Sequence, residues 1–132
     1  MSLDEALGMY AEAAQDLSSA SLACAAGNLY NCADLCNHVA EQVLQSVYVL
    51  RHDARAPYDH DLPALGRLVD VPDDIAGELA VLNRYHPALF LEGRTIEDAD
   101  DAVGETANEL VARARLVMRW ARPLVLGNAQ AG

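Results

Sequence analysis

Apolar residues recur three and four positions apart over most of the chain, which is the period of a helix that buries one face. The first such stripe consists of Leu3, Leu7, Tyr10, Ala14, Leu17, Ser21 and Cys24. The second consists of Cys32, Cys36, Val39, Val43, Ser46 and Leu50. Between them, Gly27 can adopt the left-handed conformation that ends a helix, and Asn28 can cap the next one. The pattern predicts an antiparallel hairpin of helices over about residues 3–26 and 29–52.

The middle of the chain is interrupted by four prolines between residues 57 and 87, so only short helices are expected there. Asp61 precedes a Leu-Pro pair and predicts a helix start, because aspartate accepts hydrogen bonds from free amides and proline tolerates the first turn. One short helix is predicted from there to about residue 69, and a second over about 72–84. Residues 85–94 are expected to form an ordered loop.

The last helix is predicted to begin at Thr95, with Asp98 three positions on as an acidic variant of the capping box. Its apolar stripe is Ile96, Ala99, Val103, Ala107, Leu110, Ala114, Val117, Ala121 and Leu124. Strand patterns and internal repeats are absent from the sequence. We therefore expect an all-α, up-down antiparallel helical bundle of three long helices plus one or two short ones. It should be a single domain over 1–132, with a core over about 3–124 and a tail over 125–132.

The charge of the chain narrows the classes of function. The formal net charge is −11 and the pI about 4.5, which argues against a general nucleic-acid binder with a basic face. All nine basic residues are arginine, and any contact with RNA would need a local arginine cluster. Four of them, Arg113, Arg115, Arg119 and Arg122, crowd the end of the last helix, which suits the helix dipole and also creates a local basic spot.

The cysteines and the amino terminus indicate in which cellular compartment the protein is expected. Three cysteines at positions 24, 32 and 36 lie in helical sequence, which favours reduced thiols in the cytoplasm over a disulfide framework. They lack the four-ligand spacing of a zinc site, so we expect small core residues, with no metal and no cofactor. The start of the chain, MSLDEALGMY, is unlike a signal peptide, and no apolar stretch approaches membrane-spanning length.

Several short motifs occur in a recognisable order. They are Asp16-Leu17, Gly27 with Tyr30, Ala40-Glu41, His60-Asp61-Leu62 with Leu65, and Leu82-Asn83 with Tyr85. In order and spacing this resembles a HEPN domain (higher eukaryotes and prokaryotes nucleotide-binding) over about residues 8–122. The resemblance implies a HEPN-like up-down helical bundle, often a homodimer, frequently encoded beside a minimal nucleotidyltransferase. Many such pairs resemble toxin–antitoxin modules in which an active HEPN protein is a ribonuclease.

The chain departs from this family pattern at two places. Gln42 and Gln45 stand where the family often has lysines, which removes expected phosphate contacts. Active members carry an Arg-x4-6-His motif near or on the final helix, but no histidine follows His86 here. The single pair with that spacing is Arg55 and His60, and Pro57 between them excludes a continuous helix. We interpret the segment as a loop and cap, in which His60 bonds a loop carbonyl and Asp61 caps the following helix.

Two functions from different classes remain open. The first is a dimeric, non-catalytic interaction or nucleotide-binding module that pairs with a minimal nucleotidyltransferase. The second is a metal-independent ribonuclease toxin that uses a displaced Arg55 and His60 pair. Dimerisation is also expected because apolar residues of the second helix lie outside its main stripe and would be exposed on a monomer. These residues are Leu35, Leu44, Val47 and Val49.

Three groups of polar residues are candidates for binding a ligand or partner. The second helix shows a polar side, whose simplest interpretation is a solvated or dimer-facing stripe and whose functional interpretation is a remnant nucleotide site. A second group precedes the Pro87 loop, and a third lies near the end of the last helix. The candidates are Asn37, His38, Glu41 and Gln45; Arg84, Tyr85 and His86; and Arg115, Arg119 and Trp120.

Overall fold

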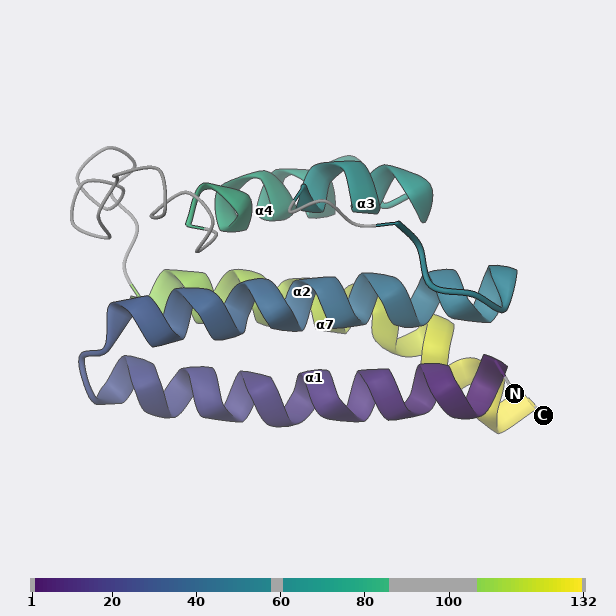
Figure 1. The fold of residues 1–132 in the computed structure, drawn as a ribbon, viewed down its shortest axis with the longest axis horizontal. Coiled ribbons are helices and arrows are strands. Elements are labelled where there is room, and N and C mark those ends of the chain that lie inside the picture. The colour runs from purple at the N-terminus through teal and green to yellow at the C-terminus, as the bar shows by residue number, and fades with distance from the viewer. Residues whose placement is uncertain (1, 58–60, 86–106, 132) are drawn as a thin grey trace.

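The structure, a computed structural model, describes residues 2–57, 61–85 and 107–131, and these residues form helices and no strand. The long helices are α1 (Ser2–Ala25), α2 (Leu29–His52) and α7 (Ala107–Ala131), and the short ones are α3 (Leu62–Leu68) and α4 (Asp73–Arg84). The prediction of an all-helical protein is confirmed. Helices α1 and α2 run antiparallel, and α3 and α4 form a second antiparallel pair, because the start of α3 at Leu62 bonds to Asn83 at the end of α4 (Figure 1). This arrangement is compatible with an up-down bundle. None of the described helices has the length and apolar character needed to cross a membrane.

The turn between α1 and α2 follows from two residues. Gly27 has a φ of +77°, a conformation that costs glycine little because it lacks a Cβ. Asn28 is the N-cap of α2, and its Oδ1 accepts a hydrogen bond from the Asn31 amide at 3.1 Å. The short connection forces α1 to lie antiparallel beside α2 (Figure 1), as the hydrophobic pattern predicts.

Helix α2 is the centre of the bundle, because it contacts α1, α3, α4 and α7. It is therefore buried on several sides and not along one stripe alone. Leu44, Val47 and Val49 are buried inside the chain, and Leu35 is half-buried. The expectation that these residues form an exposed apolar surface was wrong, because α3, α4 and α7 cover sides of α2 that a single-stripe pattern assigns to solvent.

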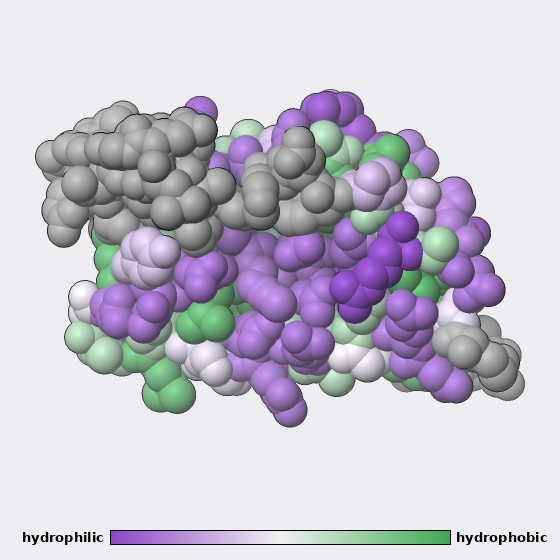
Figure 2. All heavy atoms as spheres, in the orientation of Figure 1, coloured by the Kyte–Doolittle hydropathy of each residue, from purple (hydrophilic) through white to green (hydrophobic). Residues whose placement is uncertain are grey.

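The remaining exposed apolar residues are scattered. Among the described residues, Leu22 is the most exposed of the large ones at 72%, followed by Tyr30, Leu68 and Leu116. Figure 2 shows one face of the molecule, on which apolar residues form small separate groups between polar ones. Homodimerisation stays a prediction. The apolar residues of α2 that were expected to form its interface are covered by other helices of the same chain.

Helix α1 packs along a line of small residues. Its fully buried positions are Ala6, Ala13 and Ala20, together with Met9. The predicted stripe lies beside this line: most of its members are half-buried, and Ala14 is exposed. Because α1 contacts both α2 and α7, these short alanine side chains lie buried on its packed side, and larger half-buried residues flank them.

Helix α7 follows the predicted stripe closely. Its buried residues include Leu110, Ala114, Val117 and Ala121, as expected. The helix continues to Ala131, and Val125 is buried, so helical structure extends past the boundary expected at residue 124. The predicted start of this helix at Thr95 lies outside the described residues.

The α3–α4 pair is fixed by caps. Asp61 is the N-cap of α3, and its Oδ1 accepts a hydrogen bond from the Ala64 amide at 3.0 Å. The Leu62 amide donates to Oδ1 of Asn83 in α4 at 3.1 Å, which satisfies a second free amide of the first turn. His60 lies outside the described residues, so its role beside Asp61 stays a prediction.

Candidate functional site

Three arginines share one face of α7. Arg115, Arg119 and Arg122 are separated by four and three residues, which places them one turn apart along the helix. All three are exposed. This is the most concentrated positive charge on the described part of a chain whose net charge is −11.

These arginines line a pocket of about 250 Å³, together with Tyr10 and Met118. Tyr10 comes from α1, and its hydroxyl donates a hydrogen bond to the Met118 carbonyl at 3.1 Å. The pocket therefore lies where α1 meets α7, two helices that are in contact. Among the described residues, no carboxylate lines it, so nothing there neutralises the three guanidinium groups.

The tyrosine acts as a neutral group in this pocket. Burial raises the pKa of Tyr10, and the nearby Arg122 charge lowers it by less. The phenol therefore keeps its proton at neutral pH. Guanidinium groups are planar donors that match phosphate and carboxylate oxygens in pairs. The arrangement is suited to holding an anionic group, with a hydroxyl and a thioether at its edge.

Two of the three predicted residues of this region belong to the pocket. Arg115 and Arg119 line it, whereas Trp120 is half-buried and packs against the hydrophobic core. Arg122 belongs to the arginine cluster seen in the sequence but was not predicted as a binding residue. Its spacing of three residues from Arg119 places it on the same face of the helix and could have identified it. Tyr10 could not be found from sequence, because its place in the pocket depends on the packing of α1 on α7.

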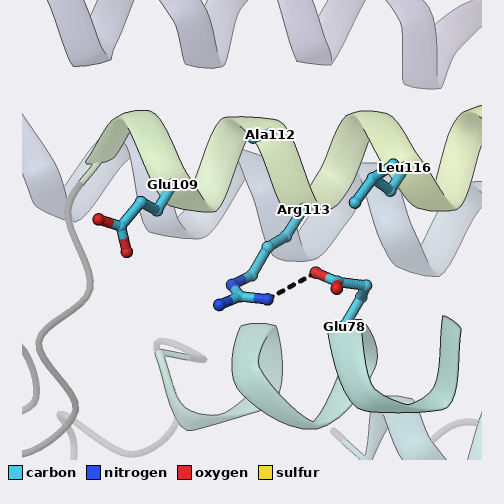
Figure 3. Close-up of a pocket in the computed structure, with 5 residues that line it drawn as sticks. All are labelled: Glu78, Glu109, Ala112, Arg113 and Leu116. Carbon is cyan, nitrogen blue, oxygen red and sulfur yellow. Dashed lines mark hydrogen bonds and ion pairs between the residues drawn. The ribbon is translucent and has the colours of Figure 1, made fainter. Parts of the chain in front are cut away.

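Arg113, the fourth arginine of the cluster, has a different environment. Its Nη1 lies 2.7 Å from Oε2 of Glu78 in α4, and both side chains are half-buried. Figure 3 shows the two groups facing each other across the space between α7 and α4, beside a pocket of about 300 Å³. Since Glu78 compensates its charge, Arg113 joins two helices and is less suited to an external anion.

The polar side predicted on α2 is divided by the structure. Asn37 and Gln45 are only 3% and 4% exposed. The Asn37 Nδ2 donates to the carbonyls of Ala33 and Leu82, both at 3.0 Å. The buried Asn37 Oδ1 has no hydrogen-bond partner among the described residues. Gln45 bonds to backbone through both polar atoms, because it donates to the carbonyl of Ala56 at 2.9 Å and accepts from its amide at 2.8 Å.

The other two predicted residues of α2 are more accessible. His38 and Glu41 are half-buried. His38 faces α1, where its Nε2 lies 3.7 Å from Oε1 of Glu12 and 3.6 Å from Oδ2 of Asp16. The four predicted residues therefore do not form one site, since two bind backbone and one meets carboxylates of α1.

The residues predicted near the end of α4 also separate. Arg84 is exposed in the last turn of α4, whereas Tyr85 is completely buried in the core. His86 lies outside the described residues. A fully buried tyrosine contacts the protein interior, so Tyr85 is not accessible to a large ligand.

The loop after α2 is attached to α1. Arg55 is exposed, and its Nε lies 3.9 Å from Oε1 of Glu5. Ser2 Oγ donates a hydrogen bond to Oδ1 of Asp53, the left-handed residue that ends α2. His60 lies outside the described residues, so the catalytic role of the Arg55 and His60 pair stays a hypothesis.

The cysteines lie among core residues. Cys32 and Cys36 are buried and Cys24 is half-buried, and all three are free thiols. Burial raises the pKa of Cys24, while the hydrogen bond between Cys36 and Cys32 raises the pKa of Cys36 and lowers that of Cys32. The Cys24 Sγ donates to Oδ1 of Asn108 at 3.0 Å and the Cys32 Sγ to the Ala107 carbonyl at 3.5 Å. These contacts join the α1–α2 hairpin to the start of the described part of α7.

Comparison with protein-family models, with curated proteins and with solved structures gives no match to this chain. The resemblance to a HEPN domain therefore rests on the sequence motifs alone. What the geometry adds is a positively charged pocket with no histidine or carboxylate among its described lining residues.

Proposed function

We propose that the protein is a non-catalytic module that binds a phosphate group, carried by a nucleotide or by the end of an RNA, in the arginine pocket of α7. The observation that carries this proposal is the convergence of Arg115, Arg119 and Arg122 with the Tyr10 phenol in one pocket that no described carboxylate lines. Three guanidinium groups supply three positive charges and many hydrogen-bond donors, which matches the charge and the acceptor chemistry of a phosphate group.

A binding role is favoured over catalysis by the groups that the pocket lacks. General acid–base catalysis at neutral pH needs a group that titrates near neutrality and lies within hydrogen-bond reach of the reacting atom. No histidine or carboxylate is among the described residues that line this pocket, and burial moves the pKa of Tyr10 away from neutrality. Arginine does not act as a base, because it stays protonated.

The wider proposal includes a homodimer and a minimal nucleotidyltransferase partner, in a toxin–antitoxin-type system. Both parts rest on the resemblance to HEPN domains. A small nucleotidyltransferase encoded beside this chain would support the pairing. Light scattering at micromolar concentration tests the dimer, since a species of 14.2 kDa alone would contradict it.

The pocket is tested by titration calorimetry with inorganic pyrophosphate, ATP and a short RNA bearing a 5′-phosphate, each at two salt concentrations. We expect binding that weakens with salt, because several cations contact the anion. Arg119→Ala should weaken it about tenfold or more, since a hydrogen bond to a charged group contributes about 1.5–3 kcal/mol.

Arg67→Ala is the matched control, because Arg67 is an exposed arginine on α3 outside the pocket. The affinity of the Arg67→Ala variant for each phosphate probe should equal that of the natural sequence. Equal losses in Arg67→Ala and Arg119→Ala would show that binding follows overall charge. Absence of binding by all three probes at low salt would contradict the proposal.

The ribonuclease alternative has its own test. Arg55→Ala and His60→Ala would both abolish RNA cleavage, with both variants fully folded, if that pair were catalytic. The structural interpretation predicts that Arg55→Ala is nearly silent, because the exposed Arg55–Glu5 pair contributes little.

A further inference from the structure

A histidine and two carboxylates meet across the seam between α1 and α2. Glu12 and Asp16 lie one turn apart on α1, and His38 faces them from α2. One ligand atom from each residue lies within 4.8 Å of the other two. Two helices packed against each other thus supply three groups that can bind a metal ion.

The distances within this cluster do not suit hydrogen bonds. The His38 Nε2 lies 3.6 Å from Asp16 and 3.7 Å from Glu12, beyond the range of about 2.7–3.2 Å for such bonds. Ligands on tetrahedral zinc, with bonds of about 2.0–2.1 Å, lie about 3.3 Å apart. A contraction of a few tenths of an ångström would bring the His38 Nε2 to that separation from each carboxylate oxygen.

An independent observation concerns the histidine nitrogen itself. The His38 Nε2 is shielded from solvent and has no hydrogen-bond partner among the described residues. An unsatisfied buried polar atom is costly, and here it is directed at two carboxylate oxygens. A neutral imidazole directed in this way could bind a cation that the carboxylates also hold.

We propose that Glu12, Asp16 and His38 form a binding site for a divalent transition-metal ion, with Zn²⁺ as the best-matched ion. One imidazole and two carboxylates are a ligand set that zinc accepts, and three protein ligands leave a fourth position for water or a substrate atom. The Glu12 side chain is 54% exposed, so the carboxylate side of the cluster is open to solvent, while the His38 Nε2 lies on its shielded side. The site is separate from the arginine pocket and does not depend on its function.

The competing explanation is a protonated His38 that forms ion pairs with both carboxylates and binds no metal. Such half-exposed pairs contribute little stability, but their geometry would resemble that observed. The two explanations differ in one measurable property, which is stoichiometric binding of a metal ion.

The test uses the full chain, first treated with a chelator and then titrated with Co²⁺ alone and with Zn²⁺ alone. We expect one equivalent of Co²⁺ with the visible absorption of a tetrahedral nitrogen–oxygen site, displaced by Zn²⁺. His38→Gln and Asp16→Asn should each lower the affinity at least tenfold. The matched control is His52→Gln, an exposed histidine on the same helix, which should bind like the natural sequence.

Several outcomes would overturn this proposal. One is that no equivalent of metal binds to the natural sequence. Another is that both His38→Gln and Asp16→Asn bind as tightly as the natural sequence. Intense near-ultraviolet absorption of the Co²⁺ form would place the ion on cysteine thiolates instead. Circular dichroism verifies that each variant is folded, and Asp16→Asn decides the question if His38→Gln does not fold.

Discussion

Helices α2 and α7 both carry polar residues beside an apolar stripe, but these side chains have opposite surroundings. The amides of Asn37 and Gln45 on α2 are buried and bond to backbone groups of neighbouring segments. Arg115 and Arg119 on α7 are exposed and line a pocket. Polar residues at similar helical spacing can therefore bond to buried backbone groups in one helix and line an exposed pocket in another.

The difference follows from how far each helix is covered. Helix α2 contacts four other helices, so many of its off-stripe positions meet protein, and a side-chain amide can satisfy backbone groups there without introducing a charge. A guanidinium group keeps its charge and needs water or an acidic partner when it leaves the surface. Arg113 shows this, because its burial is accompanied by Glu78.

If buried amides on α2 stabilise the fold, the largest loss of stability is expected at Gln45. Gln45→Ala removes both hydrogen bonds to the backbone of Ala56, which is itself 6% exposed. Leaving a buried donor and acceptor without partners should lower the free energy of unfolding by about 2–4 kcal/mol. Urea denaturation measures the change. The control Gln15→Ala, at an exposed position of α1, should stay within about 0.5 kcal/mol.

A smaller loss is expected at Asn37. Asn37→Ala leaves the Leu82 carbonyl near the end of α4 without its side-chain donor, and it removes a side-chain bond within α2. The free energy of unfolding should fall by about 1–2 kcal/mol. Asn31→Ala, at an exposed position of the same helix, is the control. If both variants were equally stable in thermal denaturation, Asn37 would not be a brace.

The third prediction concerns Asp16 and the pH. Burial raises the pKa of this carboxyl, with His38 lowering it and Glu12 raising it to smaller extents. The folded state therefore binds the proton more tightly than the unfolded state, and stability is lost as pH rises from about 4, the ordinary aspartate value, through the raised value. The Asp16→Asn variant lacks this loss of stability. In metal-free buffer, the difference between its melting temperature and that of the natural sequence should therefore increase as pH rises through that window.

The exposed Asp34 provides a control for the change in net charge. Asp34→Asn removes the same charge without removing the effect of burial at Asp16. Its melting temperature relative to the natural sequence should vary less with pH. An Asp16→Asn profile parallel to that of Asp34→Asn would contradict the role of burial.

The smallest effect on stability is expected at Arg119. Arg119→Ala should change the free energy of unfolding by less than about 0.5 kcal/mol, because the side chain is exposed. The same variant should lose affinity for phosphate compounds, as argued above. A loss of stability comparable to that of Gln45→Ala would place Arg119 among the structural braces and remove the contrast between α2 and α7.

Much of the fold could be predicted from local sequence signals. Gly27 and Asn28 marked the hairpin turn, Asp61 marked the start of α3, and periodicity located the buried side of α7. Periodicity failed where a helix has several neighbours. It reports one apolar face, whereas α2 is buried on several sides and α1 packs through alanines that carry a weak hydrophobic signal.

The candidate sites were less predictable, because each needs residues from separate helices. The arginine cluster was visible in helical spacing, but Tyr10 lies more than one hundred residues before it in the chain. The cluster of Glu12, Asp16 and His38 depends on the register between α1 and α2. Sequence spacing fixes which residues share a face of one helix, and it does not fix which faces meet.

The alanine line of α1 has a consequence for how the bundle opens. Each buried alanine removes only a small apolar area from water, so α1 should detach at a lower free energy than α2, whose buried side chains are larger. Amide hydrogens of α1 would then exchange with solvent through local opening, while those of α2 would exchange only through global unfolding. Since Tyr10, Glu12 and Asp16 all belong to α1, the opened form lacks one side of both candidate sites.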